Sequence, residues 1–198
     1  FFLTGVPEMF PGSIPIVGKK LLYIVALWLL GRVSFWFMDY LGVYIVAILN
    51  ISLTIWIISL IIKPVFADVN KRHISLAFTL LAILIIQTMF FLSVANIITI
   101  SSYSILILSL GAFIVLILLA LRRVNMEAIN ELLEQENIDE TFYSRPPRYN
   151  LAIFCVMLYT AIEFLFPNNS ILGYLALACM ASILGILNDF ILKDNNIL

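Results

Sequence analysis

Four strongly polar side chains stand inside long apolar runs of the sequence: Arg32, Asn50, Gln87 and Glu163. If each run is a helix, each of these side chains lies about 18 to 21 Å from the end of its run that is nearer the basic residues, because an α-helix rises about 1.5 Å per residue. The four side chains are therefore predicted to share one level. Polar groups deep in a membrane usually face the protein interior and contact one another.

We interpret these four residues as a candidate ligand, proton or cofactor site. An arginine inside a membrane is costly unless it is paired, and Glu163 offers an acid at the matching level. The guanidinium fork of Arg32 would suit a carboxylate such as a haem propionate, with Asn50 and Gln87 nearby. Two other interpretations stay open: a purely structural ion pair with interhelical hydrogen bonds, and an Arg32 side chain that extends to the outer headgroups.

No residue set typical of catalysis is visible, so no catalytic residue and no metal ligand is assigned. The one histidine, His73, begins an apolar run directly after Lys71 and Arg72 and is interpreted as an interfacial residue. A membrane haem usually needs histidine ligands, and this sequence alone cannot supply two. Cys155 and Cys179 lie in separate apolar runs without metal-type spacing and are interpreted as small core residues.

The composition identifies a membrane protein. The chain has 198 residues, of which 63% are hydrophobic and 12% are charged. Ordinary soluble domains carry about 25% charged residues. The expected partner is therefore the lipid bilayer, and no block of lysine and arginine suited to nucleic acid occurs.

The apolar runs predict an all-α, polytopic helix bundle with six membrane spans. An apolar run of about 18 residues or more is long enough to cross a bilayer. The sequence also begins within an apolar run, so residues 1–6 are expected to be the remnant of a further helix. The chain is therefore expected to be a fragment of a larger protein. We treat residues 1–198 as a single transmembrane domain whose predicted spans cover residues 21–38, 42–62, 73–95, 102–121, 150–166 and 171–191.

The basic residues predict the orientation of these spans. With six spans, ten lysines and arginines fall on one side of the membrane, and the loops at 39–41, 96–101 and 167–170 carry none. Loops rich in lysine and arginine usually face the cytoplasm. The predicted location is therefore the bacterial inner membrane, with the long 122–149 loop and the C-terminus in the cytoplasm. Within that loop, apolar residues at helical spacing oppose three glutamates, which predicts a short amphipathic helix.

Two sequence motifs resemble the NnrS family. The first is Phe-Leu-Thr-Gly-Val-Pro at 2–7, followed by Gly12, and the second is Leu-Trp-Leu-Leu-Gly-Arg at 27–32. Arg-Val at 123–124 is similar to a later family motif. Residues 8–11 and 126–129 depart from the family pattern, and the family's histidine-containing helix would precede Phe1.

The resemblance implies a many-spanning bacterial inner-membrane protein that binds haem and copper and acts in nitric oxide metabolism, denitrification and protection from nitrosative stress. It also implies a missing N-terminal helix and a further helical half of the same protein. Part of a secondary transporter, with its site near the membrane midplane, is the alternative from another class. A non-catalytic membrane subunit is the third possibility.

Overall fold

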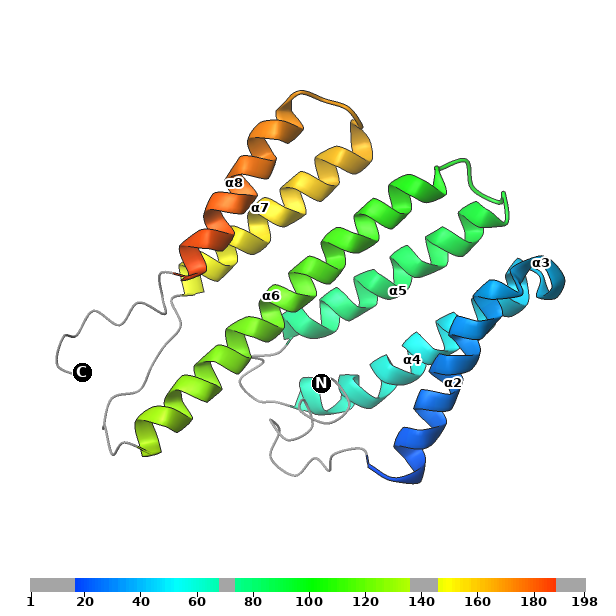
Figure 1. Ribbon diagram of the computed structural model, residues 1–198, viewed down its shortest axis with the longest axis horizontal. Helices are drawn as coiled ribbons and strands as arrows, with labels where there is room; N and C mark the ends of the chain where they lie inside the picture. The colour runs from blue at the N-terminus through cyan, green and yellow to red at the C-terminus, as the bar shows by residue number, and fades with distance from the viewer. Residues whose placement is uncertain (1–16, 68–73, 136–145, 188–198) are drawn as a thin grey trace. The chain divides into compact units, whose positions relative to one another are not determined.

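The computed structural model describes residues 17–67, 74–135 and 146–187, and every element in them is an α-helix (Figure 1). The predicted all-α fold class is confirmed. Residues 1–16 with the first family motif, His73, residues 136–145 of the 122–149 loop and the C-terminal residues 188–198 lie outside the described residues. The helices are α2 (Lys19–Trp36), α3 (Met38–Leu41), α4 (Val43–Ala67), α5 (Ile74–Val94), α6 (Ser102–Gln135), α7 (Pro146–Leu165) and α8 (Ile171–Leu187).

Six of these helices coincide with the six predicted spans. Four of them, α4, α5, α6 and α7, are long and apolar enough to cross a membrane. α8 is apolar but has only 17 described residues, and α2 carries Lys19, Lys20 and Arg32 within its 18 residues. A membrane protein with at least four candidate spans is thus established, whereas six spans remain a prediction.

The turns between the helices follow from local backbone chemistry. Gly42 separates α3 from α4 with a φ of +78°, which glycine adopts at little steric cost. Asn96 and Asn168 have φ values of +57° and +68°, just after α5 and α7. Asparagine tolerates this left-handed conformation better than most residues, so it can end a helix and reverse the chain.

α6 is longer than predicted. Its membrane span covers Ser102–Arg122, and the helix continues without a break to Gln135. The amphipathic helix predicted within the 122–149 loop is therefore the end of α6 rather than a separate element. At about 1.5 Å per residue, the 13 residues beyond Arg122 add about 20 Å to the helix.

The described helices belong to two compact units, Phe1–Ser109 and Leu110–Leu198, with the boundary inside α6. In the first unit, α4 packs against α2, α3 and α5. The Phe35 ring on α2 stacks on the Phe91 ring of α5 with 5.9 Å between ring centroids, which joins these two helices directly.

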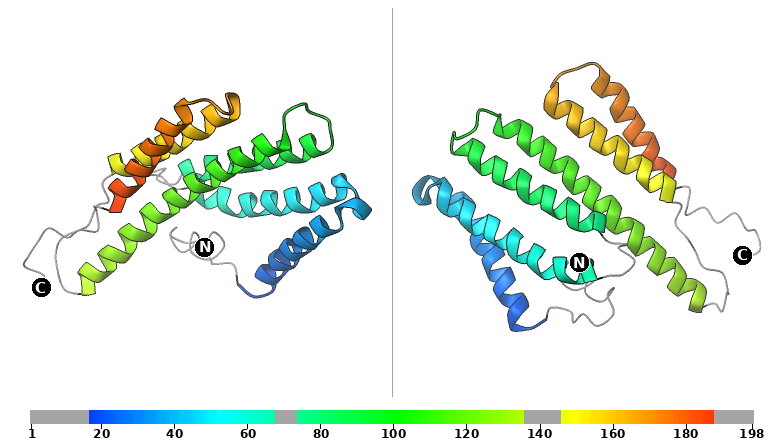
Figure 2. Two further views of the ribbon diagram at one scale, coloured as in Figure 1. Left: turned by 45° about the horizontal axis from the view of Figure 1, so that its top comes forward. Right: turned by 180° about the vertical axis from the view of Figure 1, so that it is seen from behind.

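The second unit contains the rest of α6 together with the antiparallel pair α7 and α8, which lie side by side in every view (Figures 1 and 2). A core cluster draws on all three helices: Val115, Leu118, Tyr149, Ala152, Val156 and Ile186. α6 and α7 cross closely at Gly111, because a Cβ atom there would overlap the Thr160 side chain. The glycine thus permits the crossing.

Large apolar side chains also cover the outside of the helices. Ile48 on α4, Phe78 on α5 and Ile117 on α6 are 67%, 61% and 55% exposed. Water would disfavour so much apolar surface, whereas acyl chains would cover it. This outer surface supports the membrane assignment independently of helix length.

Candidate functional site

Asn50 links two helices of the first unit. Its side chain on α4 is only 6% exposed. The amide nitrogen Nδ2 donates to the Val46 carbonyl at 2.9 Å within the same helix. It also donates to the Gly31 carbonyl of α2 at 3.3 Å. The two amide hydrogens are thereby satisfied away from water, as a buried polar group requires.

Gly31 permits this contact because it has no side chain. A Cβ atom at this position would lie 3.0 Å from Asn50 Oδ1, closer than nearly all real contacts of that kind. The Gly31 carbonyl also accepts a hydrogen bond of 2.7 Å from the buried Ser34 hydroxyl. Two side chains therefore converge on the carbonyl of the residue directly before Arg32.

Thr54 extends the network from α4 to α5. Its hydroxyl donates to Gln87 Oε1 at 2.6 Å. The same oxygen lies 3.2 Å from the Asn50 carbonyl, one turn earlier on α4. One hydroxyl proton can serve only one acceptor, and the shorter distance favours Gln87. Asn50 joins Gly31 of α2, and Thr54, one turn later on α4, joins Gln87 of α5. We call these four residues, which lie on three helices, the polar centre.

The polar centre contains two of the four residues proposed from sequence, Asn50 and Gln87. Each lies seven residues from the adjacent end of its helix, Val43 for Asn50 and Val94 for Gln87, which is about 10 Å into the membrane. Thr54, which the sequence analysis did not single out, joins them. Thr54 lies four residues after Asn50, so both side chains lie on one face of α4. This spacing is the feature of the sequence that could have identified Thr54.

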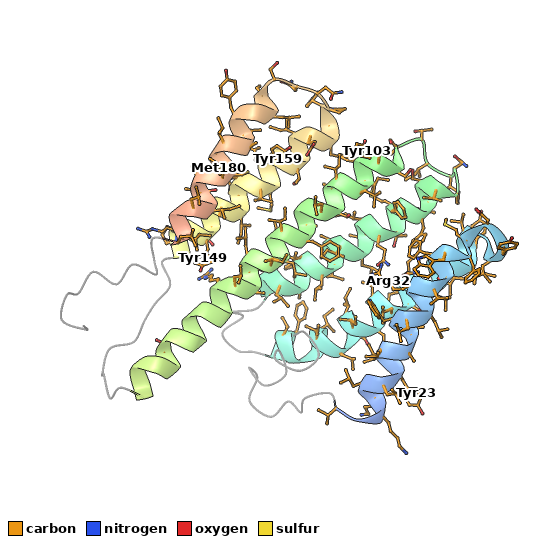
Figure 3. The ribbon with its side chains drawn as sticks, viewed as in Figure 1. Tyr23, Arg32, Tyr103, Tyr149, Tyr159 and Met180 are labelled. Atoms are coloured by element: carbon orange, nitrogen blue, oxygen red, sulfur yellow. The ribbon has the colours of Figure 1, made fainter. Side chains whose placement is uncertain are left out.

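Arg32, labelled in Figure 3, follows Gly31 on α2 and is exposed, whereas Gly31 is buried. Its guanidinium carbon is 5.7 Å from the centroid of the Trp28 ring, one turn nearer the start of the helix. Helical side chains lean toward the N-terminus of their helix, and this cation–π contact follows that direction. The guanidinium group therefore points toward the N-terminus of α2 and away from Trp36 at its C-terminus. In the predicted topology the outer headgroups lie beyond Trp36, so an Arg32 side chain that extended to them would have to point toward Trp36.

Glu163 lies on α7 in the second unit, with its side chain partly buried. Tyr159 lies one turn earlier on the same helix, near the Glu163 carboxyl group. Arg32 belongs to the first unit and Glu163 to the second, and each unit is described by itself. The Arg32–Glu163 pair remains a prediction.

A haem group fits the described residues only in part. An arginine over a tryptophan ring can hold a carboxylate and also offers a flat apolar surface. The described ranges contain no histidine, however, and no group of three or more histidine, cysteine, aspartate or glutamate side chains placed to hold a metal ion. The described residues therefore suit a propionate but supply no evident ligand to the iron.

Comparison with known proteins decides the family. The family model described as NnrS protein matches residues 1–195. The chain belongs to the NnrS family. The comparison with curated proteins found no match, and neither did the comparison with solved structures.

Family membership confirms the resemblance drawn from the two motifs. The second NnrS-like motif ends at Gly31-Arg32. The structure assigns a physical role to its glycine, since Asn50 reaches the Gly31 carbonyl where a side chain would be in the way. In this NnrS protein the motif thus marks the point where α2 meets the polar centre, with the arginine on the adjoining helix face.

Proposed function

We propose that this NnrS protein acts in the bacterial response to nitric oxide and in denitrification, as an inner-membrane protein that binds haem in its full-length form. The observation that carries the proposal is the family match over residues 1–195. Copper is the second cofactor that the family resemblance implies. No catalytic step is assigned to the described residues.

The polar centre and Arg32 support a cofactor role. Polar and charged side chains inside a membrane are costly and usually mark a ligand, ion or proton site. Arg32 would hold a propionate carboxylate by its two parallel N–H donors. Asn50 uses both amide hydrogens within the protein, so we assign it to positioning α2 rather than to contacting the cofactor. Gln87 lies at the far end of the network on α5, and we assign it to the cofactor site with Arg32 and Glu163.

Haem bound in this way would supply a redox-active iron centre that can bind small gaseous ligands. The iron ligands would come from the further helices that the family resemblance implies. The proposed topology keeps the 122–149 loop and the C-terminus in the cytoplasm. The lipid bilayer is the immediate partner.

Growth under nitric oxide tests the proposed role. A strain that lacks the gene for the full-length protein should grow more slowly than its parent in the presence of a nitric oxide donor, and the intact gene should restore growth. The Ser59→Ala variant is a matched control, because that exposed hydroxyl bonds only to a carbonyl of its own helix, and it should restore growth fully. Equal growth of the deletion strain and its parent, with or without the donor, would refute the proposal.

A further inference from the structure

The α7–α8 pair contains two free thiols, each near the middle of its helix. Cys179 lies eight residues from either end of α8, and Cys155 lies nine residues after Pro146 and ten before Leu165 on α7. Both cysteines are free and partly buried. Neither belongs to the polar centre.

The register of the two helices places the thiols at the same level. Arg148 near the start of α7 donates to the Gly185 carbonyl near the end of α8 at 3.4 Å, which shows that these two helix ends lie together. Because α7 and α8 are antiparallel, residues after Arg148 on α7 lie beside residues before Gly185 on α8. Cys155 lies seven residues after Arg148, and Cys179 lies six residues before Gly185, so the two cysteines lie at nearly the same level.

The two cysteines also face one another. Cys179 packs against the core cluster to which Ala152 and Val156 of α7 belong, and it lies seven residues before Ile186, a member of that cluster. Its thiol lies near the Cys155 thiol and the Tyr159 hydroxyl. Residues spaced i, i+3, i+4 and i+7 form the hole that receives a side chain from a facing helix. Ala152, Cys155, Val156 and Tyr159 have this spacing on α7, which places Cys179 to pack between them.

We propose that Cys155 and Cys179 form a reversible disulfide within the α7–α8 pair, with a lipid-soluble quinone as the oxidant. Two S–H bonds break and one S–S bond forms. Two electrons and two protons pass to the quinone, which leaves as the hydroquinone. The disulfide would join the two helices at mid-height and fix their register.

The surroundings favour this product over a metal complex. A disulfide is neutral, whereas two thiolates that hold a monovalent ion would leave a net negative charge in an apolar environment, which is costly. The predicted position within the membrane also determines which oxidants can reach the two thiols. Water-soluble cytoplasmic thiols keep most cytosolic cysteines reduced, but a site among acyl chains is open chiefly to reagents that dissolve in the membrane.

Thiol counting on the full chain in membrane vesicles tests the proposal. The vesicles are reduced, treated with a fully methylated benzoquinone that cannot add to thiols at a free ring position, and then denatured and tagged with a maleimide. We expect the number of taggable thiols to fall from two to zero in a chain that stays monomeric on a non-reducing gel. A membrane-permeant reductant should restore both.

Two variants serve as controls. In Cys155→Ser the remaining thiol should stay taggable after the same treatment. In Cys155→Ser combined with Met157→Cys, a thiol is moved to an exposed position on another face of α7, and both thiols should stay taggable. Two taggable thiols in the treated wild-type chain would overturn the proposal. So would disulfide-linked dimers, or loss of the single thiol in Cys155→Ser.

Discussion

At the scale of single residues, the first unit is organised by polar groups that satisfy one another away from water. Asn50 is the central example, since one amide nitrogen joins the Val46 carbonyl of its own helix to the Gly31 carbonyl of the next. Ser52, two residues later on α4, is exposed, and its hydroxyl bonds only to the Leu49 carbonyl of the same helix. The two positions differ in whether their hydrogen bonds cross between helices.

Replacing Asn50 by leucine should therefore weaken the packing of α2 on α4. We expect the Asn50→Leu variant to lose about 1 kcal/mol of unfolding free energy, a common value for a hydrogen bond between membrane helices. Unfolding by SDS titration in detergent micelles measures this loss. Ser52→Ala should stay within about 0.5 kcal/mol of the wild type, as surface substitutions usually do. An equal loss in the two variants would contradict the role given to Asn50.

The sequence predicts the level of the polar residues better than their partners. Counting along the apolar runs places Asn50 and Gln87 at similar depth, and the structure joins them through Thr54. Thr54 gives little signal in the sequence, because a threonine in an apolar helix commonly bonds to the carbonyl four residues earlier, as Thr79 and Thr88 do here. Only packing against α5 turns Thr54 into a link between helices.

At the scale of helices, the Thr54–Gln87 hydrogen bond should couple α4 to α5. A double-mutant cycle with Thr54→Val and Gln87→Leu isolates this coupling. We expect an interaction energy of about 0.5 to 1.5 kcal/mol, in the range measured for polar contacts between membrane helices. Strictly additive effects of the two substitutions on the unfolding free energy would show that the two side chains do not interact.

The crossing of α6 and α7 at Gly111 is set by the absence of a side chain. In Gly111→Ala the new Cβ would lie 2.8 Å from Thr160 Cβ and overlap the Thr160 methyl group. We expect a loss of about 1 to 3 kcal/mol, which is typical of an overpacked core. SDS titration again measures the loss.

Two further variants make the Gly111 prediction specific. Adding Thr160→Ala to Gly111→Ala should recover part of the lost stability, because the overlapping methyl group is then removed. Gly173→Ala is the matched control, since a Cβ there would meet nothing within 4 Å, and it should not destabilise the protein. If Gly111→Ala behaves like Gly173→Ala, the close crossing is refuted.

Most helices were predictable because their apolar runs are long, but two boundaries were not. The sequence predicts that the fourth span ends near residue 121, whereas α6 continues to Gln135. The two arginines at 122–123 change the polarity of the chain but not its helical propensity, since arginine is a good helix former. Residues 39–41 were predicted as a loop but all lie in the short helix α3, which ends before Gly42 reverses the chain.

At the scale of the whole molecule, the placement of basic residues predicts which ends of the helices face the cytoplasm. Val17 precedes the Lys19–Lys20 pair, and Asn169 lies in the short turn between α7 and α8. The bias of lysine and arginine toward the cytoplasm puts these two residues on opposite sides of the membrane.

Labelling of single cysteines checks this topology. In a chain with Cys155→Ser and Cys179→Ser, a membrane-impermeant maleimide added to intact cells should label Asn169→Cys at least tenfold more than Val17→Cys. Permeabilised cells should label both variants, which controls for expression. Stronger labelling of Val17→Cys in intact cells would reverse the orientation, and equal labelling would remove the basis for assigning it.

The haem content of the purified full-length protein tests the central claim most directly, namely that this NnrS protein holds a haem group beside Arg32. We predict a haem absorption spectrum and a near-stoichiometric pyridine haemochrome for the wild type and for the Ser59→Ala control. Arg32→Gln should lose at least half of the bound haem at an unchanged yield of folded protein, because the propionate would lose its charged partner. Wild-type protein without haem, or Arg32→Gln with full haem content, would contradict the account.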